Sequence, residues 1–173
     1  MSVNGVNYSL YLPSYSIGSD CYKEIPYVTR YFGKTAAVIG GKTAMSKAKQ
    51  ALLDGIDGSD VEILDFIEYG GDSTYENGDA LISNSIVREA DMIFAVGGGR
   101  ACDTGKYVAD KLDKPLFTFP TVASNCSPVT AISVIYNTDG TFRDYYYPKL
   151  ANHCFINSAV IADSPEHLLW AGI

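Results

Sequence analysis

Short apolar runs alternate along this chain with longer segments of helical character. Thr35–Gly40 and Val61–Ile67 are two such runs, and Asp91–Val96 and Pro115–Phe119 are two more. Runs of this length, bounded by glycine or proline, are typical of buried strands. Strands that alternate with helices through short connections imply a parallel sheet covered on both faces. The sequence therefore predicts an α/β protein with a Rossmann-like parallel sheet flanked by helices.

The later part of the chain has a different pattern. Ala131–Tyr136 and Thr141–Tyr147 flank Asn137–Gly140, whose residues favour a tight turn, so a β-hairpin is expected near the C-terminal part. Cys154–Ile161 is predicted as one more strand. The other expected elements are an opening strand at Ser9–Pro13 and helices at Asp20–Tyr31, Thr43–Leu53, Tyr75–Glu89 and Arg100–Leu112.

Composition excludes several classes of function. The chain has 173 residues, 47% of them hydrophobic, and a formal net charge of -7. An acidic chain repels phosphate backbones, which argues against broad nucleic-acid binding. No apolar run approaches the roughly 18 residues that span a bilayer, and the N-terminus does not resemble a signal peptide. The four cysteines form no CxxC pair, so we expect a cytoplasmic protein with free thiols and no contact with a membrane.

Three consecutive glycines, Gly97, Gly98 and Gly99, separate a predicted buried strand from a predicted helix. Glycine allows a sharp turn and close approach of a ligand. Free amides at the start of the helix carry partial positive charge and suit a pyrophosphate. Arg100 at the helix start adds a positive charge. The alternative is a tight strand–helix turn that binds nothing.

Polar residues gather on this helix and after the fourth strand. Asp103 and Lys106 share a helix face, where they form either part of a site or a surface ion pair. The loop that begins at Thr121 and includes Ser124 lies at the carboxyl edge of the sheet, where ligands bind in such folds. Neither His153 nor His167 has a motif that pairs it with Cys126 as a base, or with carboxylates around a metal. The residues alone therefore indicate binding rather than nucleophilic catalysis.

The segment GGGRACDTGK, followed by PTVASNCSPVTAISVIYNTDGTF, resembles the signature region of the glycerol dehydrogenase-like branch of the iron-containing alcohol dehydrogenase family. INSAVIADSPEHLLWAGI is similar to the family's segment before its first metal ligand. The resemblance implies a dehydroquinate synthase-like N-terminal domain. Residues 1–162 would form the Rossmann-like dinucleotide-binding domain. Residues 163–173 would begin a helical metal-binding domain. The residues themselves predict a last helix there, with a cap at Asp163 or Ser164, Pro165 at the first helical position and the helix still running at Trp170.

The resemblance also implies an activity and a set of roles. The family transfers a hydride between a nicotinamide cofactor, NAD or NADP, and a polyol or secondary alcohol, while a divalent metal polarises the alcohol oxygen. Arg100 replaces the family's usual lysine beside the pyrophosphate, and Thr130, Ile132 and Tyr136 would line the nicotinamide side. The full set of implied cofactor-binding residues is Gly97, Gly98, Gly99, Arg100, Asp103, Lys106, Thr121, Ser124, Thr130, Ile132, Tyr136, Gly41 and Lys42.

Two departures from the family pattern bear on specificity. Cys126 stands where the glycerol dehydrogenases carry a substrate-binding aspartate, and a thiol does not accept two hydroxyl hydrogen bonds as a carboxylate does. Cys126 is therefore the candidate substrate contact, for an alcohol that need not be glycerol. Gly41 and Lys42 stand where an acidic residue often binds the adenosine ribose, so a 2′-phosphate is tolerated and NADP is expected to bind.

The third departure concerns the metal. The resemblance places the family's zinc or iron ligands beyond Ile173, so no metal ligand and no catalytic residue is expected within this chain, which alone is predicted to be inactive. Leu168, Leu169 and Trp170 are expected to be exposed and to favour a homo-oligomer or contact with a further domain. Two alternatives remain: an sn-glycerol-1-phosphate dehydrogenase-like enzyme, and a non-catalytic nucleotide-binding or interaction module.

Overall fold

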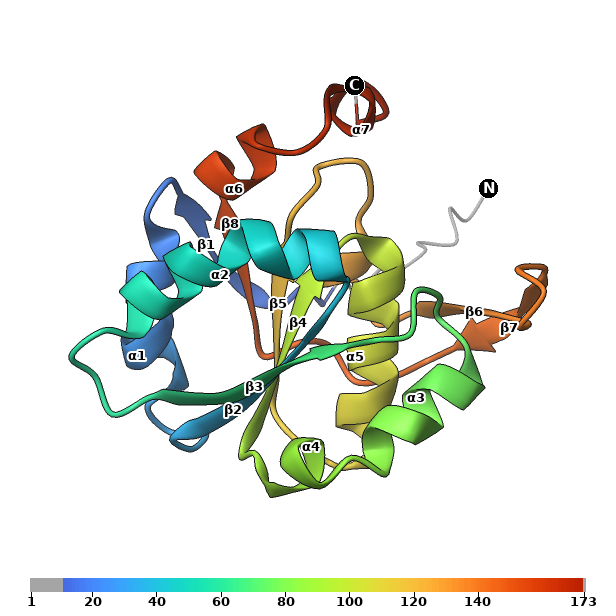
Figure 1. Cartoon of the computed structure of the whole chain (residues 1–173), viewed down its shortest axis with the longest axis horizontal. Helices are drawn as coiled ribbons and strands as arrows, with labels where there is room; N and C mark the ends of the chain where they lie inside the picture. Colours follow the sequence, from blue (N-terminus) through green and yellow to red (C-terminus); the bar gives the residue numbers. More distant parts are fainter. Residues whose placement is uncertain (1–10, 173) are drawn as a thin grey trace, which may run out of the picture.

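The computed structural model describes residues 11–172, which form one six-stranded sheet with helices on both faces and a separate hairpin (Figure 1). All neighbouring strands of the large sheet are parallel, in the order β1-β8-β5-β4-β2-β3. The predicted Rossmann-like α/β fold is therefore confirmed. The strands are β1 (Ser14–Gly18), β2 (Thr35–Gly40), β3 (Glu62–Glu68), β4 (Met92–Gly97), β5 (Leu116–Pro120) and β8 (His153–Asn157).

The predicted hairpin is also present, as an antiparallel pair set apart from the main sheet. Its strands are β6 (Ser133–Tyr136) and β7 (Phe142–Tyr146). The α-helices are α1 (Ile25–Thr29), α2 (Lys42–Ile56), α3 (Tyr75–Ile82), α4 (Ser85–Glu89), α5 (Gly99–Lys111), α6 (Ser158–Ala162) and α7 (Glu166–Trp170), and Cys21–Glu24 and Ser127–Val129 are short 3-10 helices.

Alternate side chains of the central strands enter two separate apolar clusters, one on each face of the sheet. Val38 and Phe94 pack with α2 on one face. Ile39 and Ile93 pack with α5 on the other face. Because successive strand residues point to opposite faces, strands that are apolar throughout, such as β2 and β4, serve both clusters. This two-sided burial explains why these runs are continuous rather than alternating.

The order of the strands creates a switch point at one edge of the sheet. From β2 the chain moves outward through α2 to β3, and from β4 it moves in the opposite direction through α5 to β5. β2 and β4 are neighbours, so the beginnings of α2 and α5 diverge from adjacent strand ends. Open α/β sheets bind ligands in the crevice at such a point.

Asparagine caps divide two segments that the sequence predicts as single elements. The expected helix Tyr75–Glu89 is two helices, because the Asn84 side chain accepts hydrogen bonds from Ile86 N and Val87 N and starts α4 anew. The expected strand Cys154–Ile161 ends early for the same reason. Asn157 caps α6 by accepting from Ala159 N and Val160 N at 3.0 and 3.1 Å. A cap that satisfies free amides competes with continuation of the preceding element.

The two ends of the described chain also differ from expectation. The opening strand is Ser14–Gly18 rather than Ser9–Pro13, of which residues 9 and 10 lie outside the described range. Ser14 and Ser16 hydrogen-bond the ring of His153 on β8, so a distant partner fixes this strand. The last helix begins after Pro165 and ends at Trp170 instead of running on. None of the described helices is long and apolar enough to cross a membrane.

Candidate functional site

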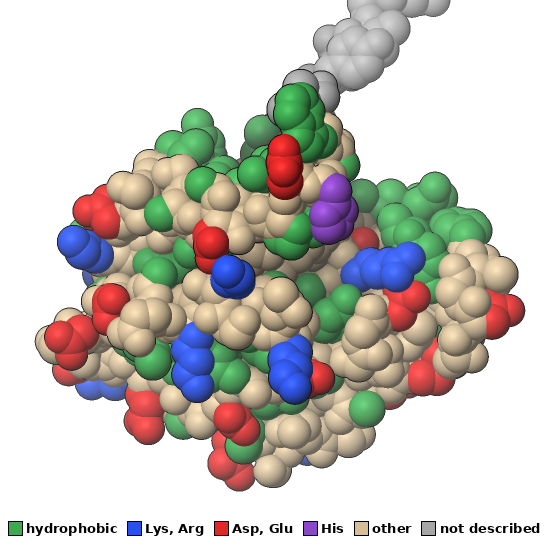
Figure 2. Space-filling model, turned by 45° about the horizontal axis from the view of Figure 1, so that its top comes forward, with side chains coloured by type: hydrophobic (Ala, Val, Ile, Leu, Met, Phe, Trp, Pro, Cys, Tyr) green, Lys and Arg blue, Asp and Glu red, His purple; other side chains and the backbone are tan. Residues whose placement is uncertain are grey.

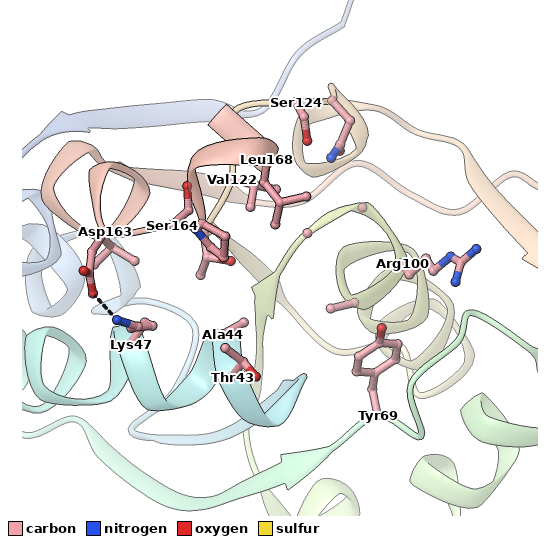
Figure 3. Close-up of a pocket in the computed structure, with 17 residues that line it drawn as sticks. Thr43, Ala44, Lys47, Tyr69, Arg100, Val122, Ser124, Asp163, Ser164 and Leu168 are labelled. Atoms are coloured by element: carbon pink, nitrogen blue, oxygen red, sulfur yellow. Dashed lines mark ion pairs between the residues drawn. The ribbon is translucent and has the colours of Figure 1, made fainter. Parts of the chain in front are cut away.

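A cleft of about 590 Å³ lies over the carboxyl ends of the strands, at the switch point between α2 and α5 (Figure 3). Its volume falls within the usual range of small-molecule sites, and most of its surface is apolar. Five predicted residues line it: Gly98, Gly99, Arg100, Thr121 and Ser124. The other lining residues are Thr43, Ala44, Lys47, Tyr69, Ala101, Val122, Asn125, Val160, Asp163, Ser164, Pro165 and Leu168.

The glycine turn forms the floor of this cleft. Gly97 ends β4 with a φ of +146°, a conformation that residues with a side chain rarely adopt, and a Cβ added there would lie 2.8 Å from the Ala101 Cβ. Gly98 is the N-cap of α5, and no side chain caps that helix. The first amides of a helix have no partner within it. The turn therefore offers a set of uncapped N–H groups to the cleft, as the triple glycine predicts.

Arg100 lines the cleft, but its guanidinium contacts Asp72 and Tyr136. Its Nε lies 3.3 Å from Asp72 Oδ1, and its guanidinium lies 4.8 Å from the centre of the Tyr136 ring. Figure 3 shows the side chain pointing away from Val122 and Leu168, which border the other side of the cleft. In this conformation Arg100 therefore joins the loop before α3 to the hairpin rather than facing the centre of the cleft.

The opposite wall of the cleft comes from residues that the sequence does not predict as ligand contacts. The sequence predicts a cap of the last helix at Asp163 or Ser164, but Pro165 is the N-cap of α7 and no side chain caps it. Lys47 on α2 forms an ion pair of 2.7 Å with Asp163, which follows α6, and Figure 3 marks this pair with a dashed line. The buried hydroxyl of Ser164 has no hydrogen-bond partner among the described residues. The signal that would have identified this wall is topological: the residues after β8 reach the same edge as the glycine turn.

The surface around this edge carries basic side chains despite the acidic composition. Figure 2, in which the top of Figure 1 is turned forward, shows Lys and Arg side chains across the middle of the face.

Within the cleft, Tyr69 donates its hydroxyl hydrogen to Gly71 O at 2.8 Å. Burial raises the pKa of that hydroxyl, so Tyr69 stays neutral at physiological pH. No fixed negative charge therefore arises from this tyrosine beside the glycine turn.

Asp103 and Lys106 lie beneath the turn as a buried ion pair, so the interpretation as a surface ion pair is wrong. Their charged atoms are 2.8 Å apart, and their side chains are 6% and 0% exposed. Lys106 Nζ donates to Ser127 O at 3.0 Å, and it also contacts two further carbonyl oxygens of the next loop. Asp103 accepts from Ser127 Oγ at 2.7 Å. The pair thus binds the loop and does not line the cleft.

The remaining predicted residues lie around the cleft without lining it. Thr130 and Ile132 each offer a backbone oxygen to Lys106 Nζ. Gly41 is the N-cap of α2 and Lys42 its exposed first residue, one position before the lining residue Thr43. Cys126 is exposed in the loop after β5, directly after the lining residue Asn125. The structure therefore brings the predicted set to one edge of the sheet but divides it into lining and supporting residues.

The donor set of this edge fits an anion held by backbone amides better than a metal ion. Within residues 11–172, no three His, Cys, Asp or Glu side chains come together as metal ligands. The cleft instead combines uncapped amides, hydroxyls and apolar walls. A dinucleotide, with an anionic centre between two rings, needs that combination.

Comparison with known proteins agrees with this fold. The sequence model of the iron-containing alcohol dehydrogenases matches residues 13–163. A glycerol dehydrogenase of Thermotoga maritima is 36% identical over 106 residues, which cover 61% of this chain and 29% of that protein. A glycolaldehyde reductase of Halobacterium salinarum is 29% identical over 92% of this chain and 44% of its own. The crystal structure of glycerol dehydrogenase from Schizosaccharomyces pombe superposes with a TM-score of 0.82 at 24% identity, covering 96% of this chain and 43% of that one. The chain thus spans less than half the length of each of these relatives.

Proposed function

This chain belongs to the iron-containing alcohol dehydrogenase family, and we propose that its cleft binds a nicotinamide dinucleotide by the diphosphate bridge. The single observation that carries the proposal is the uncapped start of α5 at the floor of the cleft. Amides at this position attract an anion through direct hydrogen bonds and through the helix dipole. The apolar walls on either side then suit the two ring systems.

Two further features of the cleft support a ligand of this kind. The unpartnered Ser164 hydroxyl is a buried polar group that a bound ribose or phosphate oxygen would satisfy. Thr121 and Ser124, which also line the cleft, add two further hydroxyls. Gly98 and Gly99 carry no side chain of their own, which favours close approach of a phosphate oxygen to the turn, and Asn125 is the side chain packed nearest Gly99.

The reaction we propose is hydride transfer between this cofactor and the hydroxyl-bearing carbon of a small polyol or secondary alcohol. Two relatives are named for such chemistry: the glycerol dehydrogenase for the oxidation of a polyol, and the glycolaldehyde reductase for the reduction of a small hydroxyaldehyde. When bound, the cofactor supplies the hydride chemistry. The residues of this chain bind and orient it, and we assign Cys126, exposed on the loop after β5, as a substrate contact. The described residues offer no metal site, so we derive no step through a metal.

The difference in burial between α6 and α7 also supports a domain boundary near residue 162. Val160 on α6 packs into the apolar cluster beneath α2, whereas no residue of α7 is buried. We therefore propose that residues up to 162 form the dinucleotide-binding domain and that α7 lies outside it. Of the three apolar residues expected to be exposed, Trp170 is 66% exposed, whereas Leu168 and Leu169 are half-buried. The Trp170 side chain is therefore the one that we propose to meet a further domain or a second copy.

The proposal can be tested with a variant that stabilises α5 but lowers the affinity for the diphosphate. Gly98 has the backbone conformation of an N-cap, so Gly98→Asp is expected to cap α5 and preserve stability. Its carboxylate would repel the diphosphate, and we expect NADH affinity to fall by about tenfold or more. Gly98→Ser, which caps without charge, is the control and is expected to lose less affinity. Titration by NADH fluorescence measures both, and equal affinity of wild type and Gly98→Asp would refute binding at this turn.

We further propose that NADP is accepted. The α2 start carries Gly41 and Lys42 in place of a carboxylate, and Lys47 lines the cleft one turn further on. Lys42 in place of a carboxylate directly after β2 favours a 2′-phosphate. Lys47 is paired with Asp163, so the acceptance of NADP depends on Lys42. Gly41→Asp is expected to weaken NADPH binding by about tenfold while NADH binding changes little. Wild-type protein that binds NADH but not NADPH would contradict this part of the proposal alone.

A further inference from the structure

We propose that Asp103 and Lys106 are positioning residues, which hold one wall of the cleft in place without touching the ligand. The inference rests on the proposed function and refines it. Resemblance to the family gives these two residues a place among cofactor-binding positions, but neither lines the cleft. Their side chains are almost fully buried beneath the glycine turn. What they contact is the backbone of the loop that follows β5 and leads into β6.

Lys106 provides the first half of this connection. Its ammonium group is fully buried and donates to the carbonyl oxygens of Ser127, Thr130 and Ile132. A buried ammonium requires a counter-charge and acceptors for its hydrogens, and here the loop backbone supplies the acceptors. If the loop moved away, the buried Lys106 ammonium group would therefore lose its hydrogen-bond acceptors.

Asp103 provides the second half. One carboxylate oxygen forms the ion pair with Lys106 Nζ at 2.8 Å and accepts from Ser127 Oγ at 2.7 Å. The other accepts from Val134 N at 3.1 Å, where the hairpin begins. The pair is thus hydrogen-bonded to both ends of the loop segment 127–134, and hydrogen bonds to charged groups are stronger than those between neutral groups.

Ser127 transmits this positioning to the cleft. Its hydroxyl contacts both Asp103 Oδ1 and Gly99 O, and its backbone N–H donates to Asn125 Oδ1 at 3.1 Å. Asn125 and Ser124 line the cleft, and Asn125 Oδ1 lies 3.1 Å from where a Cβ would stand on Gly99. The buried pair thereby sets how far the Ser124–Asn125 wall stands from the glycine turn.

The distance between the Ser124–Asn125 wall and the glycine turn matters because the two are closely packed. A diphosphate held by amides requires hydrogen-bond distances that tolerate only a few tenths of an ångström. Substitution of Ser127 removes the link between the buried pair and the wall but leaves both charges in place. It is therefore a milder change than substitution of Asp103 or Lys106, either of which leaves one buried charge unpaired.

The test compares Ser127→Ala with Ser127→Thr and with a distant control. Thr29→Ala is the matched control, because the Thr29 hydroxyl is also buried, donates to Ile25 O at 2.8 Å and lies on α1, outside the cleft. We expect Ser127→Ala to raise the Kd for NADH by about fivefold, which corresponds to the net contribution of one hydrogen bond. Ser127→Thr keeps the hydroxyl and is expected to stay near the wild-type Kd. Thr29→Ala is expected to lower the melting temperature with an unchanged Kd.

Amide hydrogen exchange of residues 124–134 is the second readout, and it needs no ligand. Faster exchange in Ser127→Ala and in Asp103→Asn, but not in Thr29→Ala, is the expected result. Unchanged exchange together with an unchanged Kd in Ser127→Ala would overturn the positioning role. If wild-type protein does not bind NADH, the proposed function fails, and the exchange experiment alone still decides whether the pair positions this loop.

Discussion

Two ion pairs near the cleft have nearly equal length and very different surroundings. On the inner side, Asp103 and Lys106 are 2.8 Å apart, with exposed fractions of 6% and 0%. On the open side, Lys47 and Asp163 are 2.7 Å apart, with exposed fractions of 45% and 63%. Water screens the second pair and not the first, so similar distances imply different energies.

The difference indicates how the cleft combines a rigid wall with an adjustable one. The inner pair is enclosed by loop carbonyls and a backbone amide, so breaking it exposes unsatisfied groups. The outer pair connects α2 to the α6–α7 segment through two exposed side chains. Exposed pairs contribute little to stability and weaken further with salt. We therefore expect substitutions on the inner side to lower the free energy of unfolding far more than substitutions on the open side.

The largest effect is expected for Lys106→Met. The change leaves the Asp103 carboxylate buried without a counter-charge, and removal of one partner of a buried pair typically costs about 3–5 kcal/mol. Urea denaturation followed by circular dichroism measures the change in the free energy of unfolding. A double variant, Asp103→Leu with Lys106→Met, is the control and is expected to lose less than the single variant. If Lys106→Met lowered the free energy of unfolding by less than about 1 kcal/mol, the inner pair would contribute no more than an exposed pair, which would contradict the account.

Gly97→Ala is expected to have the next largest effect, also on the inner side. The new methyl group would meet Ala101 Cβ at 2.8 Å in a residue whose φ is +146°. Strain of this kind costs about 1–3 kcal/mol, and relief of it by movement of the turn would weaken NADH binding. Gly140→Ala is the matched control, since Gly140 has a φ of +82° but nothing within 4 Å of the added Cβ. Equal melting temperatures and equal Kd values for the two variants would contradict a special role for Gly97.

Asp163→Asn is expected to have a small effect because it alters the open side. The pair with Lys47 is exposed, so the free energy of unfolding should fall by at most about 1 kcal/mol. The difference from wild type should shrink as salt is added. Denaturation at low and high ionic strength measures it. A loss above about 2 kcal/mol that persists in high salt would show that the two pairs do not differ as their burial suggests.

The smallest effect on stability is expected for modification of Cys126, whose side chain is exposed on the loop after β5. Cys126 is exposed, whereas Cys21, Cys102 and Cys154 are buried. Burial raises the pKa of the Cys21 thiol to about 11 and raises the pKa of Cys102 and Cys154, which further suppresses their reactive thiolates. Ellman's reagent should therefore modify one thiol rapidly and three only on unfolding. Rapid reaction that persists in Cys126→Ser would show that a cysteine buried in the structure becomes accessible in the folded protein.

Much of the fold follows from local patterns in the sequence. Thr35–Gly40 is bounded as predicted because its apolar run is continuous and stops at a glycine pair. The hairpin turn at Asn137–Gly140 and the glycine turn after β4 follow in the same way, since few residues adopt the required backbone. Element ends marked by asparagine are harder to predict. Asn84 and Asn157 each start a new helix, and a capping side chain is not distinguished by periodicity.

The candidate site is predictable only in part, because burial depends on partners far away in the chain. The motif spacing identifies Gly98 and Gly99, but it does not reveal that Asp103 and Lys106 are covered by the loop at Ser127. The other wall of the cleft, from Lys47 to Leu168, is assembled when β8 joins the sheet between β1 and β5. No local pattern encodes that juxtaposition, since it depends on strand order.

Nitrogen-15 NMR of the chain, titrated with NADPH and with NADH, observes the amides of the glycine turn themselves. We expect the backbone amides of Gly98, Gly99, Arg100 and Ala101 to show the largest downfield shifts, because the uncapped start of α5 receives the diphosphate. The amide of Gly140, at the far hairpin turn, should not move. Saturable binding with shifts confined to other surfaces, and none at these four amides, would contradict diphosphate binding at this turn.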